Sequence, residues 1–124
     1  MNRIQDIFDN VTSCADYAAK YVAHMSSVLN ALDTEAVAKA TEALEKAADE
    51  NKTVFFAGNG GSAAVASHWV NDLAANTVVE GAPGYRVISL ADNAPSITAI
   101  ANDASFDEIF SIPVSYTHLR AHET

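Results

Sequence analysis

Apolar side chains recur at alternating steps of four and three along residues 2–32, a stretch without Pro or Gly. The positions are Ile4, Phe8, Val11, Ala15, Ala18, Val22, Met25, Leu29 and Leu32. A 3.5-residue repeat held over this length is typical of a helix that lies along another helix. One helix of about 30 residues would be about 45 Å long, more than a domain of this size covers. We therefore expect part of the stripe to pack against a second copy of the chain, the alternative being a core helix of the monomer.

A second helix and two strands are predicted in the middle of the chain. Residues 34–50 have apolar positions at helical spacing, and Asp33 is a favourable N-cap. Residues 53–57 form a short apolar run bounded by polar residues and a glycine cluster, which predicts a buried strand. Residues 63–75 have helical composition, and residues 85–90 are predicted to be the second strand.

The last predicted elements are short. Pro95 favours a helix that begins near Asp92 and ends near Ala101. Asn102 and Asp103 are then expected in a loop, and Phe106–Ser111 is expected to be a helical turn.

The glycine cluster between the first strand and the following helix indicates an anion site. It consists of Gly58, Asn59, Gly60, Gly61 and Ser62. Backbone N–H groups converge at such a turn, and the helix dipole favours negative charge there. The Ser62 hydroxyl adds a further donor. We therefore expect a ligand that carries phosphate, the alternative being a tight turn without a ligand.

A dinucleotide is the weaker candidate for that ligand. Gly58, Gly60 and Ala63 satisfy the spacing G-x-G-x-x-A, but the dinucleotide fingerprint also needs an acidic residue about 20 positions further on, after the next strand. The first acidic residue after that strand is Asp92, at a poor spacing. No Gly-Lys-Ser/Thr follows the cluster, which excludes a nucleoside triphosphate loop.

The combination of motifs resembles the sugar isomerase (SIS) family. The matching blocks are Gly58–Ala63 with His68, then Thr98–Asp103, then Phe106–Phe110. Within the family, the chain is most similar to the phosphoheptose isomerase subgroup over about residues 1–113. The resemblance implies an α/β fold, a flavodoxin-like doubly wound parallel sheet between helices, here its N-terminal part only and preceded by long N-terminal helices. It also implies a homotetramer.

The resemblance further implies a reaction and a set of site residues. Phosphoheptose isomerases convert sedoheptulose 7-phosphate into an aldoheptose 7-phosphate through an enediol. The glycine-loop serine, here Ser62, binds the sugar phosphate in that family, and the Asn-Asp pair, here Asn102 and Asp103, lies beside the sugar. The position of Asp72 is usually Glu and acts as the base, while the position of His68 contributes to the metal site of zinc-containing members.

His68 and Asp72 are spaced to share one face of the helix that begins at the glycine loop. Ketose–aldose exchange needs a base that moves a proton between adjacent carbons and an acid that serves the carbonyl oxygen. A carboxylate and an imidazole fit these roles, although Asp is one methylene shorter than Glu. The pair supplies too few ligands for zinc without further residues. A surface pair that merely supports the helix is the alternative. Trp69 is expected to pack on the sheet or at a subunit contact, rather than to stack on substrate.

Composition excludes several other classes of protein. The 7 Lys and Arg stand against 16 Asp and Glu, for a net charge of −9, which disfavours direct binding of nucleic acid. The single Cys14 excludes a disulfide framework. No apolar run approaches the roughly 18 residues of a membrane span, and the first residues do not resemble a signal peptide. We expect a cytoplasmic protein.

The resemblance ends near Pro113. Residues 1–113 are expected to be the N-terminal part of an SIS domain. Residues 114–124 lack an apolar period and are expected to be a non-native read-through tail. His118 and His122 in that tail have the spacing of a metal pair, but no native metal role is expected for them.

The sequence therefore predicts a sugar-phosphate-binding SIS domain of isomerase type, inactive as truncated because the second phosphate loop and a late catalytic His of the family are missing. The alternative within the same fold is a non-catalytic oligomeric adaptor, similar to the protein that associates with the bacterial replication initiator. A dinucleotide-dependent oxidoreductase is the third class, which tight binding of a nicotinamide cofactor would identify.

Overall fold

The computed structural model describes residues 3–120, with side chains described as far as Thr117. These residues divide into two compact units, and the boundary between them falls after Lys39. The helix α3 (Thr34–Asp49) begins in the first unit and ends in the second. No helix in the described part of the chain is long and apolar enough to cross a membrane.

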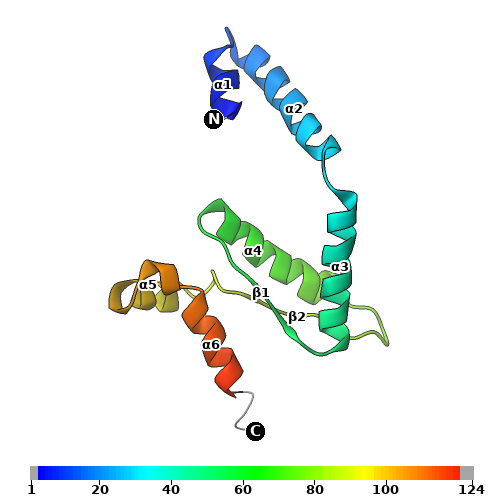
Figure 1. Ribbon diagram of the computed structural model, residues 1–124, viewed down its shortest axis with the longest axis vertical. Helices are drawn as coiled ribbons and strands as arrows, with labels where there is room; N and C mark the ends of the chain where they lie inside the picture. The colour runs from blue at the N-terminus through cyan, green and yellow to red at the C-terminus, as the bar shows by residue number, and fades with distance from the viewer. Residues whose placement is uncertain (1–2, 121–124) are drawn as a thin grey trace. The chain divides into compact units, whose positions relative to one another are not determined.

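The first unit contains two antiparallel helices in place of the single long helix that the stripe predicts. These are α1 (Arg3–Asp9) and α2 (Cys14–Asn30), which lie side by side in Figure 1. The prediction of one continuous helix over residues 2–32 is therefore wrong. The reason is local capping, because the Ser13 hydroxyl accepts a hydrogen bond from the Asp16 N–H at 3.1 Å and begins a new helix.

Polar and aromatic contacts fix the turn between α1 and α2. The Asn10 side chain donates to the Asp6 carbonyl at 2.7 Å, which ends α1, and Lys20 donates from α2 to the Asn10 carbonyl at 3.0 Å. Phe8 and Tyr17 meet edge to face with ring centroids 5.9 Å apart. The two helices therefore pack on each other through the first part of the stripe.

Much of the same stripe is exposed beyond that contact. Phe8 stays 63% exposed in that contact, and Val22 and Leu29 of α2 are 62% and 65% exposed, although each is apolar. One face of α2 therefore carries exposed apolar side chains within the first unit.

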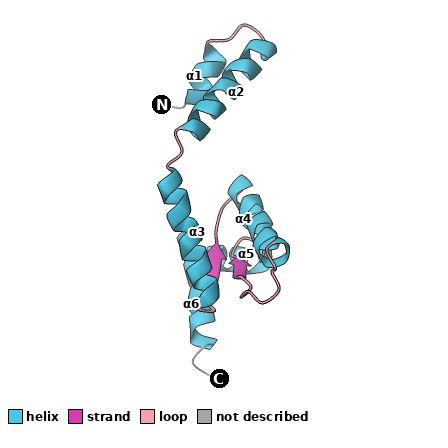
Figure 2. Cartoon of the chain, turned by 90° about the vertical axis from the view of Figure 1, so that its right-hand side faces the viewer, coloured by secondary structure: helices cyan, strands magenta, loops and turns pink. Residues whose placement is uncertain are grey.

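The second unit is built on a strand–helix–strand motif. The parallel strands β1 (Thr53–Phe56) and β2 (Arg86–Ser89) pair from Thr53 with Arg86 to Phe56 with Ser89. Between them runs α4 (Gly61–Asn71), which continues as a π-helical turn over Asp72–Asn76. Figure 2 shows the two strands lying parallel. The predicted α/β fold with a parallel sheet is confirmed, and the described residues contain two of its strands.

Short helices follow β2. They are α5 (Ala94–Asp103), a 3-10 turn (Phe106–Glu108) and α6 (Ser111–Arg120). Asn102 and Asp103 form the last turn of α5, so the prediction that they lie in a loop is wrong; the helix runs on because neither Gly nor Pro interrupts it before Ala104. Residues 114–120 are helical, although their sequence lacks an apolar period.

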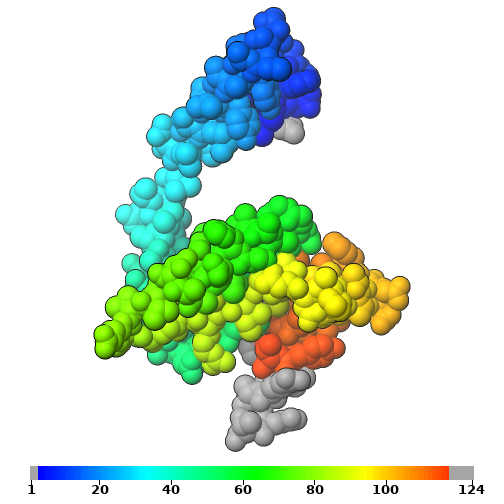
Figure 3. Space-filling view, turned by 180° about the vertical axis from the view of Figure 1, so that it is seen from behind, coloured from blue at the N-terminus to red at the C-terminus, as the bar shows by residue number. Residues whose placement is uncertain are grey.

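Small apolar contacts hold the second unit together. Its buried residues are Ala48, Ala66, Leu90 and Ile109, with Ser89 the one buried polar residue in the described part. Seen from behind in Figure 3, α4 in green covers the region of the strands. The Leu90 N–H donates to the Phe56 carbonyl at 2.8 Å, so pairing continues one residue past β2. The ends of β1 and β2 are thereby fixed beside each other under α4.

Candidate functional site

The turn between β1 and α4 depends on a glycine. A Cβ at Gly58 would lie 2.5 Å from the backbone carbonyl carbon and oxygen of Ser62, closer than real contacts allow. Gly60, the N-cap of α4, has a φ of 56°, a region that glycine enters without steric cost. The end of the strand and the first turn of the helix can therefore approach closely only with these residues.

The amino end of α4 is open to a ligand. No side chain caps it, since Gly60 is the N-cap, and the Ser62 hydroxyl is exposed and makes no hydrogen bond with any described residue. The Ser62 N–H donates to the Asn59 carbonyl at 3.1 Å, which closes the turn. The Ala63 and Ala64 N–H groups donate to the Gly60 carbonyl at 3.1 and 3.3 Å, so the helix dipole and the exposed Ser62 hydroxyl are what favour an anion at this position. The predicted residues Gly58–Ser62 thus form one continuous loop.

His68 and Asp72 meet as their spacing predicts. The His68 Nε2 lies 3.3 Å from the Asp72 Oδ2, and the two side chains are 73% and 46% exposed. Asn76, one π-helical turn further on, donates to the other carboxylate oxygen at 3.0 Å. Both oxygens of Asp72 therefore face donors from its own helix. π-Helical turns of this kind occur frequently at functional sites.

Two hollows lie along α4 and share Trp69. A groove of about 330 Å³ includes Ser62, Val65 and Trp69 in its lining, and a hollow of about 210 Å³ is lined by Trp69, Asp72 and Leu73. The Trp69 ring packs on Phe56 of β1 with centroids 5.6 Å apart, yet the residue stays 48% exposed. Trp69 thus packs on the sheet as predicted, while its exposed part borders both hollows.

Asn102 and Asp103 lie on a different element from the other candidate residues. Both are exposed at the end of α5, where the Asn102 amide donates to the Asp103 carboxylate at 2.7 Å. Within the described residues, no hydrogen bond or ion pair joins them to the glycine loop or to α4. The fold brings His68 and Asp72 into contact with each other. Asn102 and Asp103 have no direct link to those two residues.

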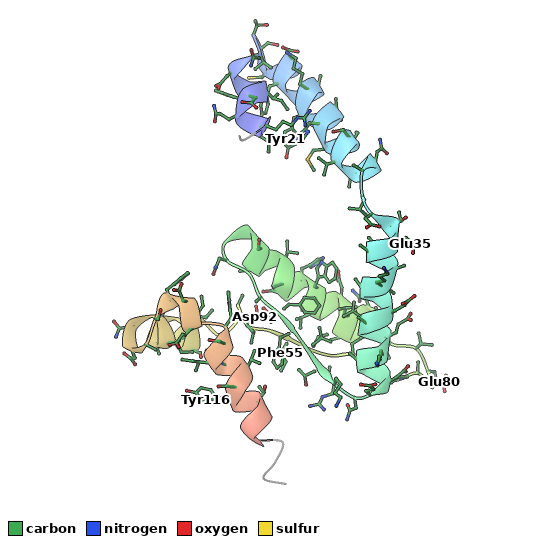
Figure 4. All side chains as sticks on the ribbon, viewed as in Figure 1. Tyr21, Glu35, Phe55, Glu80, Asp92 and Tyr116 are labelled. Atoms are coloured by element: carbon green, nitrogen blue, oxygen red, sulfur yellow. The ribbon has the colours of Figure 1, made fainter. Side chains whose placement is uncertain are left out.

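A second contact that joins α4 to the strand ends was not predicted. Asp92, three residues after β2, accepts hydrogen bonds at one carboxylate oxygen from Ser67 of α4 and from Ser89 of β2, the latter at 3.0 Å. Figure 4 labels Asp92 between α4 and the start of α5. The sequence signal was an acidic residue just after a strand of the parallel sheet, where ligands and site residues gather.

A zinc ion would need more ligands than this site supplies. His68 and Asp72 provide two donors on successive turns, and zinc takes three or four from protein. No group of three His, Cys, Asp or Glu residues in the described part could hold a metal ion. These residues alone therefore do not fit a zinc site. His122 and the His118 side chain lie outside the described residues and side chains.

Comparison with known proteins identifies what the chain is similar to. The family model described as "SIS domain" matches residues 16–119. The chain is 51% identical over 61 residues to a probable phosphoheptose isomerase of Thermoplasma acidophilum, covering 49% of this chain and 32% of that protein. It is 40% identical over 77 residues to a phosphoheptose isomerase of Shewanella denitrificans, covering 62% and 39%.

A solved structure agrees with these sequence matches. The phosphoheptose isomerase of Neisseria gonorrhoeae superposes with a TM-score of 0.64 at 25% identity, covering 88% of this chain and 52% of that one. The chain thus spans about a third to two fifths of the length of the two curated relatives and about half of the solved chain.

The close approach at Gly58 predicts opposite effects for two neighbouring glycines. Gly58→Ala should lower the free energy of unfolding by about 1–3 kcal/mol, because the methyl group meets backbone atoms that cannot move aside. Gly61→Ala is the matched control: its added Cβ meets nothing within 4 Å, and Ala favours a helix by up to about 1 kcal/mol. Urea unfolding of both variants measures the difference. Equal destabilisation by the two substitutions would contradict the steric account of the turn.

Proposed function

The chain belongs to the SIS domain family, and from this membership we propose that it binds a sugar phosphate and carries part of a ketose–aldose isomerase site. The observation that carries the proposal is the amino end of α4, which no side chain caps and where the Ser62 hydroxyl is exposed beside the glycine turn. The similarity to phosphoheptose isomerases favours sedoheptulose 7-phosphate or a related sugar phosphate as the substrate.

Backbone groups hold the phosphate in this proposal. The helix α4 contains no Lys or Arg, and the whole chain has a net charge of −9. Attraction of the phosphate therefore has to come from N–H dipoles at Gly58–Ser62, which act at short range, with Ser62 donating one further hydrogen bond. Asn102 and Asp103 contact the hydroxyl groups of the sugar.

Asp72 and His68 carry the proton transfers. Asp72 takes a proton from the carbon that bears a hydroxyl next to the carbonyl, while His68 protonates the carbonyl oxygen, which gives an enediol. The second enediol hydroxyl then returns its proton to His68 as the new carbonyl forms, and Asp72 delivers its proton to the neighbouring carbon. His68 and Asp72 lie about 9 and 15 Å from Ser62 along the helix axis, so a sugar chain anchored by its phosphate reaches His68 first.

A non-catalytic oligomeric adaptor is the second candidate function. The observation that favours it is the exposed apolar face of α2, including Val22 and Leu29, which suits contact with another protein chain. Both candidates include self-association. They differ at α4, because an adaptor needs neither an open anion site nor a His68–Asp72 pair.

Replacing the serine of the loop tests the phosphate site. Ser62→Ala should weaken binding of sedoheptulose 7-phosphate by about 1–3 kcal/mol, because it removes one hydrogen bond to a charged group. Ser26→Ala is the matched control, since Ser26 is exposed on α2 and donates to the Val22 carbonyl. Titration calorimetry gives both affinities. If Ser62→Ala and the unaltered chain bind equally well, the proposed phosphate site is wrong.

Charges placed on the apolar face of α2 test self-association. Val22→Asp combined with Leu29→Asp should yield smaller species in sedimentation, because two carboxylates cannot be buried unpaired in an interface. Ala23→Asp combined with Asn30→Asp adds two carboxylates at the same spacing on an adjoining face of the helix. Circular dichroism checks that the helices remain. Sedimentation profiles that do not differ between the two double variants would contradict an interface at this face.

The residues described here are not expected to isomerise sugar phosphates by themselves. The matched stretch holds less than half of either curated relative, so site residues that come from the rest of those proteins are not part of it. Loss of one group that positions the substrate or assists Asp72 and His68 in proton transfer typically costs about 10²–10⁴ in rate. A coupled assay with sedoheptulose 7-phosphate should therefore detect no turnover by the 124-residue chain. A longer protein sharing residues 1–113 should be active and lose activity on Asp72→Asn. Turnover by the shorter chain that survives Asp72→Asn would overturn both expectations.

A further inference from the structure

One carboxylate oxygen of Asp92 links the segment after β2 both to α4 and to the end of β2. Its Oδ1 accepts hydrogen bonds from the Ser67 hydroxyl of α4 and from the Ser89 hydroxyl, 3.0 Å away, at the end of β2. The Ser67 hydroxyl also lies 3.0 Å from the Ala63 carbonyl one turn earlier in α4, so its one proton has an acceptor in its own helix as well as Asp92. Ser89 is 8% exposed, and its hydroxyl oxygen also accepts the Ala91 N–H at 3.2 Å. The carboxylate is thereby connected to the backbone that leads out of the strand.

Ser67 stands between the two candidate functional parts of α4. It follows Ser62 of the anion site and directly precedes His68. A helix moves as a rigid element over so short a distance, so an anchor at Ser67 fixes both the rotation of α4 about its axis and its position along that axis. Ser62 and the His68–Asp72 pair are then held at set places over the ends of the strands.

The other contacts of α4 with the sheet do not fix its rotation in the same way. Ala66 is the buried residue of α4, and Trp69 packs on Phe56 from the adjoining face. Such apolar contacts are non-directional and tolerate small rotations of the helix. Among the described residues, the bond to Asp92 is the one side-chain hydrogen bond that joins α4 to the segment after β2.

The negative charge of Asp92 does not help to bind an anion at the same edge of the sheet. A carboxylate repels phosphate, so a direct role in holding that group is excluded. The anchoring needs only one oxygen atom that accepts hydrogen bonds from two hydroxyl groups. An amide oxygen at the same place would accept them as well.

We propose that Asp92 is a positioning residue, which holds α4 over the strand ends so that Ser62 and the His68–Asp72 pair can contact the same ligand. The inference rests on the proposed function for the ligand, whereas the anchoring of α4 does not depend on it. It makes Asp92 and Ser67 part of the machinery of the site, although neither has to touch the substrate.

Three variants of the full chain test the proposal, with inorganic phosphate and sedoheptulose 7-phosphate as separate probes. Asp92→Ala should weaken binding of both probes by about fivefold, because the anion site loses its fixed position. Asp92→Asn should restore affinity to within about twofold, since its amide oxygen can accept both hydroxyls. Glu80→Ala, which removes the same charge from an exposed residue in the loop before β2, should bind as the unaltered chain does.

Affinities are measured by amide chemical shifts at a temperature where circular dichroism finds every variant fully folded. Unchanged affinity in folded Asp92→Ala would mean that Asp92 serves stability alone, and would overturn the proposal. Weaker binding of the sugar phosphate but not of inorganic phosphate would assign Asp92 a direct sugar contact, which also overturns it. If Asp92→Ala does not fold, Ser67→Ala takes its place, with the same expected loss for both probes.

A second measurement separates this proposal from the proposed function. Residual dipolar couplings report the orientation of α4 relative to β1 and β2 without any ligand. If the unaltered chain binds neither probe, the proposed function fails. The dipolar couplings then test by themselves whether Asp92 positions α4. A changed orientation in Asp92→Ala that Asp92→Asn restores supports the positioning role, whereas an orientation common to all variants refutes it.

Discussion

The close approach of Gly58 to the backbone of Ser62 is the constraint on which the second unit depends. A Cβ at Gly58 would overlap the first turn of α4, so this turn exists only because residue 58 has no side chain. The chain can then reverse within a few residues and send α4 back over β1. Once α4 runs back, β2 has to pair parallel to β1, and the carboxyl ends of both strands meet under the amino end of the helix. The proposed anion site and the contacts of Asp92 both follow from that reversal.

Local patterns were sufficient to predict the elements that carry their own signals. Asp33 accepts the N–H groups of Glu35 and Ala36 and begins α3 where the sequence indicates. The apolar run before the glycine cluster became β1, and Asn93 with Pro95 begins α5. For both helices the capping interaction lies within the first turn, whereas β1 also depends on its pairing with β2. Apolar periodicity and capping residues indicate such local interactions in the sequence itself.

The N-terminal helices show where periodicity misleads. A 3.5-residue stripe continues through Val11 and suits both one long helix and two helices that fold onto each other. The difference comes from the polar residues between them, where Asn10 closes one helix and the Ser13 hydroxyl opens the next. The stripe is then divided between a contact inside the unit and exposed positions. Phe8 meets Tyr17 inside the unit, and Val22 and Leu29 remain exposed.

The candidate site divides in the same way between local and long-range interactions. Gly58–Ser62 and the His68–Asp72 pair each lie within one turn of helix or loop, so their spacing predicted them. Ser67 and Asp92 are 25 residues apart, and only the register of β1 with β2 brings them together. No local pattern contains that register. The proposed site therefore includes a tertiary contact that spacing alone could not predict.

The distribution of charge along α4 explains why such an anchor matters in an acidic chain. With no Lys or Arg on α4, the helix attracts an anion only through oriented N–H groups at one end, and dipoles lose strength quickly with distance and angle. A lysine could follow a displaced phosphate, because its charge acts in all directions and its side chain is flexible. Backbone N–H groups cannot follow a displaced phosphate in this way. Phosphate binding by the glycine loop, as we propose it, thus depends on the placement of the whole helix, and in our inference that placement depends on the directional bond between Ser67 and Asp92.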